Sequence, residues 1–333
     1  MTGPQPCFEA RLARACRLLL AAAIVVVASG CAQMVPQTVA LRTGWPHGVP
    51  QTQKLEDVPF FPQDEYQCGP AALATVLAFT GVPVTPEPLV SQVYVPARRG
   101  SLQLEMLAAA RRHGRVSYVI APRYGDLLRE VAAGNPVLVL QDVGALAQQW
   151  HYAVVNGFDY PSGTVYLRSG TVAKLEMPFT AFERSWMKSG YWAMVVTPPD
   201  RIPATATEDA WVNAVLGLAR VGTQEQVTTA FATALERWPE NLAAAVGLAN
   251  QFHARGSLAR ATEVLREARR RHPGSAIVAN NLAQVLSEQG QQREALTLIE
   301  QAASDPSNPF ASEIRSTREA IVERIKRGGA TPR

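Results

Sequence analysis

The stretch Gln63-Asp-Glu-Tyr-Gln-Cys-Gly-Pro-Ala-Ala-Leu73 holds Cys68, the one cysteine beyond the first 31 residues of the 333-residue chain. Pro70 suits the first turn of a helix, and the apolar spacing extends that helix to about Thr80, where Gly81 ends it. A thiol at a helix N-terminus faces unpaired backbone N–H groups and the positive end of the helix dipole, which favour the reactive thiolate. We therefore predict that Cys68 is a nucleophile. The alternative, a small buried hydrophobic residue, fits its neighbours less well.

A nucleophilic thiol also needs donors for the oxyanion that forms when it attacks a carbonyl. The backbone N–H of Cys68 can supply one donor, and a side-chain amide a few residues upstream can supply the second. Gln63 is the first candidate for that amide, and Gln67 is the second.

The thiol further needs a base. Residues 58–199 contain two histidines. His113 follows two arginines at the end of a predicted helix, which indicates an exposed C-cap. His151 begins a predicted strand, from which its ring can project into a cleft. We assign His151 as the base, with a hydrogen-bonded core histidine as the alternative.

The N-terminus reads as a secretory signal over residues 1–30. Three arginines precede an apolar run of about a dozen residues, too short to span a bilayer comfortably. Ser29-Gly-Cys31 resembles the bacterial lipobox, which implies cleavage before Cys31, its diacylation and a lipid bilayer as a partner. Ala32 in place of aspartate implies an outer-membrane lipoprotein that faces the periplasm. An ordinary signal peptide or an uncleaved anchor is the alternative.

Between this signal and the cysteine stretch, residues 31–57 carry three prolines and no periodicity, so we predict a tether that holds the domain off the membrane. Residues 58–199 are predicted to form one α+β domain, with helices first and an antiparallel sheet after them. The first predicted helix has Pro70 in its first turn and runs to about Thr80, and the other predicted helices are Pro86–Val93, Leu102–His113 and Tyr124–Ala133. The predicted strands are Val116–Ile120, Val137–Leu140, His151–Phe158, Thr164–Leu167 and Tyr191–Val196.

Residues 206–327 are predicted to be helical throughout and to contain a repeat. Gly222, Gly256 and Gly290 are spaced by 34 residues, and several alanines and prolines share this period. The spacing resembles tetratricopeptide repeats, with about three units from 206 to 306 and a capping helix near Ser312–Lys326. A generic helical bundle with coincidental spacing is the alternative.

Composition sets limits on the function. The net charge of +4 includes a net +2 in residues 1–30, where three arginines outnumber one glutamate, so nucleic acid is not an expected partner. The cysteines Cys7 and Cys16 lie in the predicted signal, which leaves no even set for a disulfide framework. No cysteine–histidine cluster suggests a metal, and no cofactor is expected.

At this point the motifs carry a resemblance. Gln-(x4)-Cys-Gly-Pro-Ala-Ala-Leu, followed about 80 residues later by His151-Tyr-Ala-Val-Val-Asn-Gly-Phe-Asp159, resembles the bacteriocin-processing, double-glycine-leader peptidases of the papain-like clan. The chain is especially similar to their stand-alone lipoprotein branch with tetratricopeptide repeats. The resemblance implies an α+β papain-like fold that holds Cys68 and His151 across a cleft, with Gln63 as the oxyanion donor. The family commonly places that glutamine six residues before the cysteine, and Gln63 is five before.

The resemblance also implies a third catalytic residue. Family members usually place an aspartate just after the strand that follows the histidine strand, and Ser169 stands at that place. A serine hydroxyl can accept a hydrogen bond from His151 but cannot stabilise an imidazolium by charge. Asp159 and Asn156 are alternatives that could instead be turn residues, and we favour Ser169 slightly over Asp159.

Together these features lead us to expect a lipid-anchored, periplasm-facing cysteine peptidase that hydrolyses peptide bonds. Its repeats are expected to recruit a protein partner or substrate through their concave face. Two alternatives stay open. The same thiol chemistry could serve an amidase or transpeptidase on cell-wall peptides, or a degenerate peptidase domain could act as a repeat-based binding scaffold.

Overall fold

A computed structural model describes residues 35–62, 67–98, 100–303 and 308–329. The predicted signal, the predicted lipidation site Cys31 and the predicted oxyanion donor Gln63 lie outside these residues. The chain divides into two compact units. The first comprises Met1–Phe79, Val84–Ser101 and Val119–Val195, and the second comprises Thr80–Pro83, Leu102–Tyr118 and Val196–Arg333. Each is described by itself.

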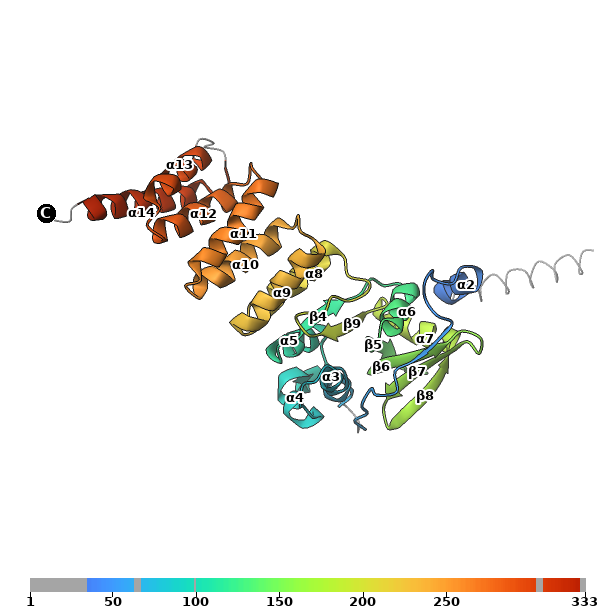
Figure 1. Ribbon diagram of the computed structural model, residues 1–333. Coiled ribbons are helices and arrows are strands. Elements are labelled where there is room, and N and C mark those ends of the chain that lie inside the picture. The colour runs from blue at the N-terminus through green and yellow to red at the C-terminus, as the bar shows by residue number, and fades with distance from the viewer. Residues whose placement is uncertain (1–34, 63–66, 99, 304–307, 330–333) are drawn as a thin grey trace, which may run out of the picture. The chain divides into compact units, whose positions relative to one another are not determined.

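The main sheet has seven strands (Figure 1). They are β1 (Thr52–Lys54), β4 (Val116–Val119), β5 (Val137–Asp142), β6 (Trp150–Asp159), β7 (Thr164–Ser169), β8 (Val172–Pro178) and β9 (Ala193–Thr197). Their order is β4-β9-β5-β6-β7-β8, and β1 also pairs with β6. The pairs of β6 with β1, β5 and β7 are antiparallel, as are β5 with β9 and β7 with β8. The alternation of apolar residues and turn residues had predicted such a sheet, and the α+β fold is confirmed.

Five helices belong to the first unit: α2 (Pro36–Thr43), α3 (Cys68–Phe79), α4 (Pro86–Val93), α6 (Tyr124–Ala132) and α7 (Phe179–Trp186). Two short 3₁₀ helices (Pro96–Arg98 and Met187–Ser189) and a small two-stranded sheet, β2 (Tyr94–Val95) with β3 (Gly100–Ser101), complete it. The sequence predicts one buried stripe on α3, but every residue from Gly69 to Leu77 is buried. A helix that is apolar all round is stable inside a domain, so α3 is a core helix that holds Cys68 firmly at its first position.

The tether predicted over residues 31–57 is wrong for residues 35–57, which pack on the first unit. The carboxylate of Glu183 in α7 accepts hydrogen bonds from the backbone N–H groups of Gln37 (2.9 Å) and Thr38 (2.6 Å) at the start of α2. Leu41 is buried, Trp45 packs against Phe158 and Tyr160, and β1 joins the sheet. Hydrogen bonds to distant residues therefore order a segment whose own sequence has no periodicity.

In the second unit, paired helices follow one another from residue 208 (Figure 1). The pairs are α8 (Glu208–Leu218) with α9 (Gln224–Arg237), α10 (Leu242–Ala254) with α11 (Leu258–Arg271) and α12 (Ala276–Glu288) with α13 (Gln292–Ala302), and α14 (Ala311–Gly329) follows. The predicted glycines all fall between the helices of a pair. Gly256 and Gly290 have positive φ angles of 71° and 82°, which a residue without a Cβ adopts at little cost. The predicted repeat architecture is confirmed.

The second unit also takes α5 (Gln103–Arg112) and most of β4, which the sequence had assigned wholly to the domain 58–199. Gly217 of α8 lies so close to α5 that a Cβ there would meet the guanidinium of Arg111 at 2.5 Å. The Tyr118 hydroxyl donates to the carbonyl of Thr205 at 3.3 Å. The division into compact units therefore does not follow the order of the chain. In the part of the chain that the structure describes, no helix combines the length and apolarity needed to cross a membrane.

Candidate active site

Cys68 is the first residue of α3, and its thiol contacts the backbone of β6. The N–H groups of Tyr152, Gly69 and Cys68 itself point to the sulfur and lower the pKa of the thiol. Tyr152 is the neighbour of His151 along β6, so α3 brings the thiol to the start of the strand that carries the histidine.

Burial acts on the same thiol in the opposite direction, and it is the larger effect. It raises the pKa of Cys68 above its ordinary value. The thiolate that the helix N-terminus alone would favour is therefore not the resting form at neutral pH. This corrects the expectation from the sequence, because the burial comes from elements that are distant along the chain.

His151 lies at the start of β6, and its Nε2 is 2.9 Å from the Oγ of Ser169 at the end of β7. The pairing of Val154 with Arg168 in these antiparallel strands makes His151 and Ser169 diagonal neighbours. Burial lowers the pKa of His151, so its ring is neutral at neutral pH. With Nε2 bonded to Ser169, Nδ1 is the ring nitrogen left to take a proton. This requires the tautomer in which Nε2–H donates and the serine hydroxyl accepts.

The structure does not bring Asp159 to His151. Asp159 ends the same strand, eight residues away, which corresponds to roughly 26 Å along a straight strand. Its Oδ1 accepts from the N–H of Ser162 at 3.4 Å, so it is a turn residue. Asn156 is fully buried in β6 and donates from Nδ2 to the carbonyl of Leu55 at 3.1 Å, which fastens the segment after β1.

Gln67 and His113 are the other two candidates from the sequence. Gln67 is exposed, and its carbonyl accepts the N–H of Ala71 in the first turn of α3 at 3.1 Å. His113 follows α5 in the second unit, where its backbone N–H bonds to Ala109 as a C-cap.

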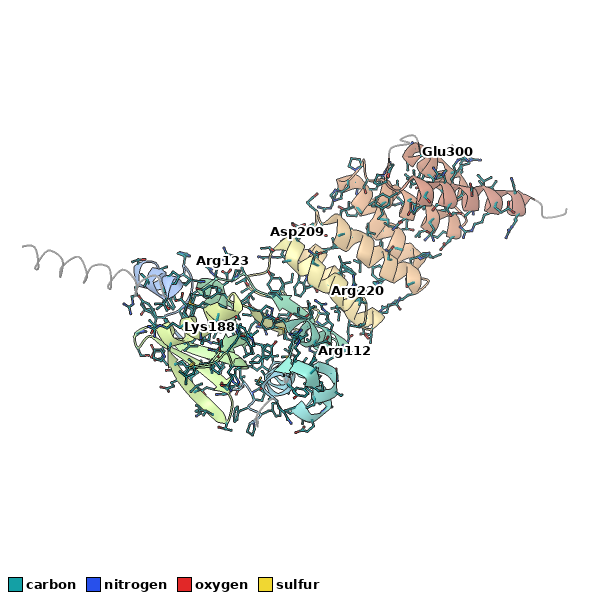
Figure 2. The ribbon with its side chains drawn as sticks, turned by 180° about the vertical axis from the view of Figure 1, so that it is seen from behind. Arg112, Arg123, Lys188, Asp209, Arg220 and Glu300 are labelled. Atoms are coloured by element: carbon teal, nitrogen blue, oxygen red, sulfur yellow. The ribbon has the colours of Figure 1, made fainter. Side chains whose placement is uncertain are left out.

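The sequence reasoning missed Asp142, the acid at the end of β5. Asp142 pairs across the sheet with Trp150, next to His151. Its Oδ1 accepts from the N–H groups of Gly144 (3.0 Å) and Gln149 (2.8 Å), and its Oδ2 pairs with Lys188 at 3.2 Å (Lys188 is labelled in Figure 2). The bond from Gln149 is the main reason that the pKa of Asp142 is lowered. This carboxylate holds the loop before His151 in place. In the sequence, the position of Asp142 just before the loop that leads to His151 is the signal that could have identified it.

Tyr152 is the second residue that the sequence reasoning missed. Its hydroxyl donates to the carbonyl of Ser101 at 3.2 Å, and its ring meets Trp192 edge-on. Burial, and to a smaller extent the nearby Cys68, raises its pKa, so it stays a neutral donor. Its position immediately after the histidine, in a strand with alternating orientation, is the signal that could have identified it.

The Cys68 thiol lies at a helix N-terminus, against the backbone of the residue that follows His151, and the His151 ring is bonded to a hydroxyl. A thiol and a histidine are the residue types that a cysteine hydrolase uses. Among the described residues, no group of three or more His, Cys, Asp or Glu side chains could hold a metal ion.

Comparison with known proteins agrees with this class. Residues 55–194 match the Peptidase_C39 like family. The fold is an α+β, C39 peptidase-like domain over these residues, followed by stacked helix pairs with the 34-residue period of tetratricopeptide repeats. No curated protein matches the chain.

Solved structures are similar to each part. A C39-like peptidase from Bacillus anthracis is 17% identical, with 44% of this chain and 98% of that one covered and a TM-score of 0.38. A double glycine motif protease from an AMS/PCAT transporter, solved in complex with the leader peptide, is 23% identical. The match covers 43% of this chain and 93% of that one, with a TM-score of 0.34. For the helices, pilF of Pseudomonas aeruginosa is 28% identical. The match covers 36% of this chain and 54% of that one, with a TM-score of 0.33.

Proposed function

We propose that this protein is a lipid-anchored cysteine peptidase that hydrolyses peptide bonds with Cys68 as nucleophile and His151 as base. The observation that carries the proposal is the hydrogen bond between the backbone N–H of Tyr152 and the thiol of Cys68. His151, the residue before Tyr152, is bonded to Ser169 at 2.9 Å. The match of residues 55–194 to a C39-like peptidase family supports it.

The reaction starts from a neutral thiol and a neutral imidazole, because burial disfavours both charged forms. As the Cys68 sulfur attacks the peptide carbonyl carbon, His151 Nδ1 takes the thiol proton. The N–H of Cys68 and the amide of Gln63 hold the oxyanion of the tetrahedral intermediate. His151 then returns the proton to the leaving amine, which leaves a thioester on Cys68. Finally His151 activates a water that hydrolyses this thioester to a free carboxylic acid.

Ser169 has a defined task in this scheme. Its hydroxyl accepts from Nε2–H and so fixes the tautomer in which Nδ1 is the base. A hydroxyl lacks the charge that would stabilise an imidazolium, so the attack step is expected to be slower than with an aspartate.

Anchoring and location belong to the same proposal. Diacylation of Cys31 would hold the protein at the periplasmic face of the outer membrane. Val35, the first residue that the structure describes, is buried and lies four residues after Cys31, and four residues reach at most about 14 Å. The first unit would therefore work at the bilayer surface rather than at the end of a long tether. Mass spectrometry of the protein from the membrane fraction of cells should find a diacylated Cys31 at the N-terminus, and an unmodified Cys31 would count against lipidation.

A second candidate, a binding scaffold without catalysis, is favoured by the serine at the acid position and by the raised pKa of Cys68. Mass spectrometry can separate the two. The protein is incubated with a diverse peptide library and with cell-wall peptides, beside Cys68→Ala, His151→Ala and a matched His47→Ala control, since His47 is an exposed histidine.

We expect new peptide termini with wild type and His47→Ala, and none with the other two variants. Products from cell-wall peptides alone would identify an amidase. A complete absence of products from every substrate would favour the scaffold.

A further inference from the structure

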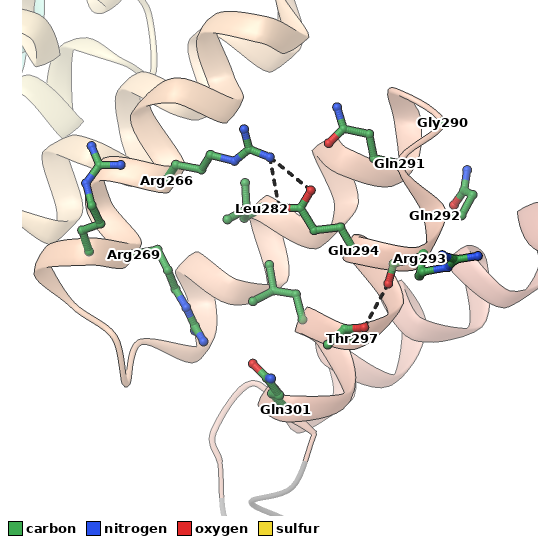
Figure 3. A pocket seen from close by; sticks show the side chains of 12 residues that line it. Arg266, Arg269, Leu282, Gly290, Gln291, Gln292, Arg293, Glu294, Thr297 and Gln301 are labelled. Atoms are coloured by element: carbon green, nitrogen blue, oxygen red, sulfur yellow. Dashed lines mark hydrogen bonds and ion pairs between the residues drawn. The ribbon is translucent and has the colours of Figure 1, made fainter.

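The second unit contains a groove of about 920 Å³ between α11 and α13, with Leu282 of α12 in its wall (Figure 3). This volume lies within the range of ligand-binding pockets. The groove is lined by the second helix of each of two repeats, and it does not involve Cys68 or His151. The proposed catalysis therefore does not explain this groove.

The charge of the groove is strongly unbalanced. Four arginines (Arg266, Arg269, Arg270 and Arg293) line it, against one acid, Glu294. Arg270 pairs with Glu267 and Arg266 with Glu294. Within the described chain, the guanidinium groups of Arg269 and Arg293 have no hydrogen-bond or ion-pair partner, and Arg269 is partly buried. Their donors are free for an external anion.

Glu294 shows which anion fits. Its Oε1 and Oε2 lie 3.0 and 3.1 Å from the Nη2 of Arg266 across the groove (Figure 3). A carboxylate is thus already accommodated between α11 and α13. Glu294 also competes for the positive charge, because it neutralises one of the guanidinium groups that an incoming carboxylate could use.

The rest of the lining favours a peptide over other polyanions. Leu282 and Leu298 supply apolar surface beside the arginines, and Thr297 supplies a hydroxyl. No aromatic side chain is among the lining residues, so bases of a nucleic acid would have nothing to stack on. Guanidinium groups match the fork of a carboxylate better than ammonium groups do.

We propose that this groove binds an acidic peptide segment of a protein partner. Carboxylates of the segment bond to Arg269 and Arg293, and its apolar side chains pack on Leu282 and Leu298. This interaction surface is independent of the proposed catalysis.

The test uses the full chain with Cys68→Ala, so that probes are not consumed. Fluorescein-labelled peptides in which glutamate or aspartate alternates with leucine are titrated by fluorescence polarisation. The same peptides with glutamine and asparagine, and vesicles of phosphatidylglycerol and phosphatidylcholine, are run beside them. The variants are Arg269→Gln with Arg293→Gln, Glu294→Gln, and Arg237→Gln as a matched control, since Arg237 is exposed on α9 away from the groove. Thermal unfolding checks that each variant is folded.

We expect the acidic peptides to bind, and the double variant to bind about tenfold more weakly, equivalent to about 1.4 kcal/mol. Arg237→Gln should bind as before, and Glu294→Gln should bind about threefold more tightly because Arg266 is released. The proposal is overturned if no acidic peptide binds, if the neutral peptides bind equally well, or if the arginine variants leave affinity unchanged. Binding of the vesicles alone, weakened in the double arginine variant, would assign the groove to anionic lipid and would also overturn it. Should the double variant not fold, Arg269→Gln and Glu294→Gln must still shift affinity in opposite directions.

Discussion

At the residue scale, Ser169 is bonded to His151, which we propose as the base. The hydroxyl orients the ring through a 2.9 Å bond but adds no charge. Ser169→Ala should lower kcat/KM about fivefold, because a neutral hydrogen bond contributes about 1 kcal/mol. Kinetics on the best peptide substrate measure this, with the turn residue variant Ser162→Ala as a control that should behave as wild type.

Ser169→Asp gives the complementary prediction. Burial lowers the pKa of His151, and the base must be neutral, so the acid limb of the wild-type pH–rate profile lies below the ordinary histidine value of about 6.5. A carboxylate beside Nε2 favours imidazolium and raises that pKa, so the limb should move to higher pH while the maximal rate increases. An unchanged profile would argue that residue 169 does not act on His151.

The pKa of Cys68 leads to a further residue-scale prediction. Because burial raises this pKa, little thiolate exists at neutral pH in the free protein. The rate of alkylation of Cys68 by iodoacetamide should therefore keep rising above about pH 8.5, the usual thiol value. Peptide mapping by mass spectrometry follows Cys68 alone. A plateau already reached at pH 7 would mean that a preformed thiolate exists.

Much of the site could be predicted at this scale. Cys68, His151 and the position of Ser169 follow from local patterns and from spacing between motifs. The pKa of the thiol and the task of Asp142 could not, because both depend on side chains and backbone groups that only folding brings together. Asp159 was a reasonable alternative on orientation alone, and its place at the far end of β6 removes it.

At the scale of elements, α2 is held to the first unit mainly through Glu183. The carboxylate is fully buried and accepts from two N–H groups of α2 and from the hydroxyl of Tyr191. Glu183→Gln replaces an acceptor-only group by an amide with one acceptor oxygen, so we expect a loss of about 2–3 kcal/mol of unfolding free energy. Chemical denaturation measures it, and limited proteolysis should cut faster within residues 36–57.

The exposed Glu176 on β8 provides the control for this prediction. Glu176→Gln should leave both stability and proteolysis close to wild type. If Glu183→Gln does the same, α2 is held by its apolar contacts instead. The docking of α2 could not be predicted, because its hydrogen bonds join residues more than 140 positions apart. The apolar segments that form α3 and β6 were predicted close to their observed ends, because glycine and other turn residues flank them.

At the scale of the whole molecule, the repeats are an array whose stability depends on each unit and its neighbours. Gly256 has a φ of 71° with nothing near its missing Cβ, so Gly256→Ala adds strain without a clash. We expect a loss of about 1 kcal/mol. Gly274 lies in the next turn with equally open space and no positive φ, so Gly274→Ala should cost little. Equal losses of unfolding free energy for Gly256→Ala and Gly274→Ala in denaturation experiments would show that the positive φ at Gly256 does not matter. The 34-residue spacing predicted the array, and Gly256 and Gly290 share a positive φ at equivalent turns.

The central claim is that Cys68 is a nucleophile served by His151, and covalent trapping tests it most directly. The full chain is treated with a panel of peptides that carry a thiol-reactive vinyl sulfone, and intact mass with peptide mapping locates the adduct. The account predicts a single adduct on Cys68, formed at least about a hundredfold more slowly in His151→Ala and at the wild-type rate in His47→Ala. Equal rates in wild type and His151→Ala, or no adduct on Cys68 with any peptide, would contradict it.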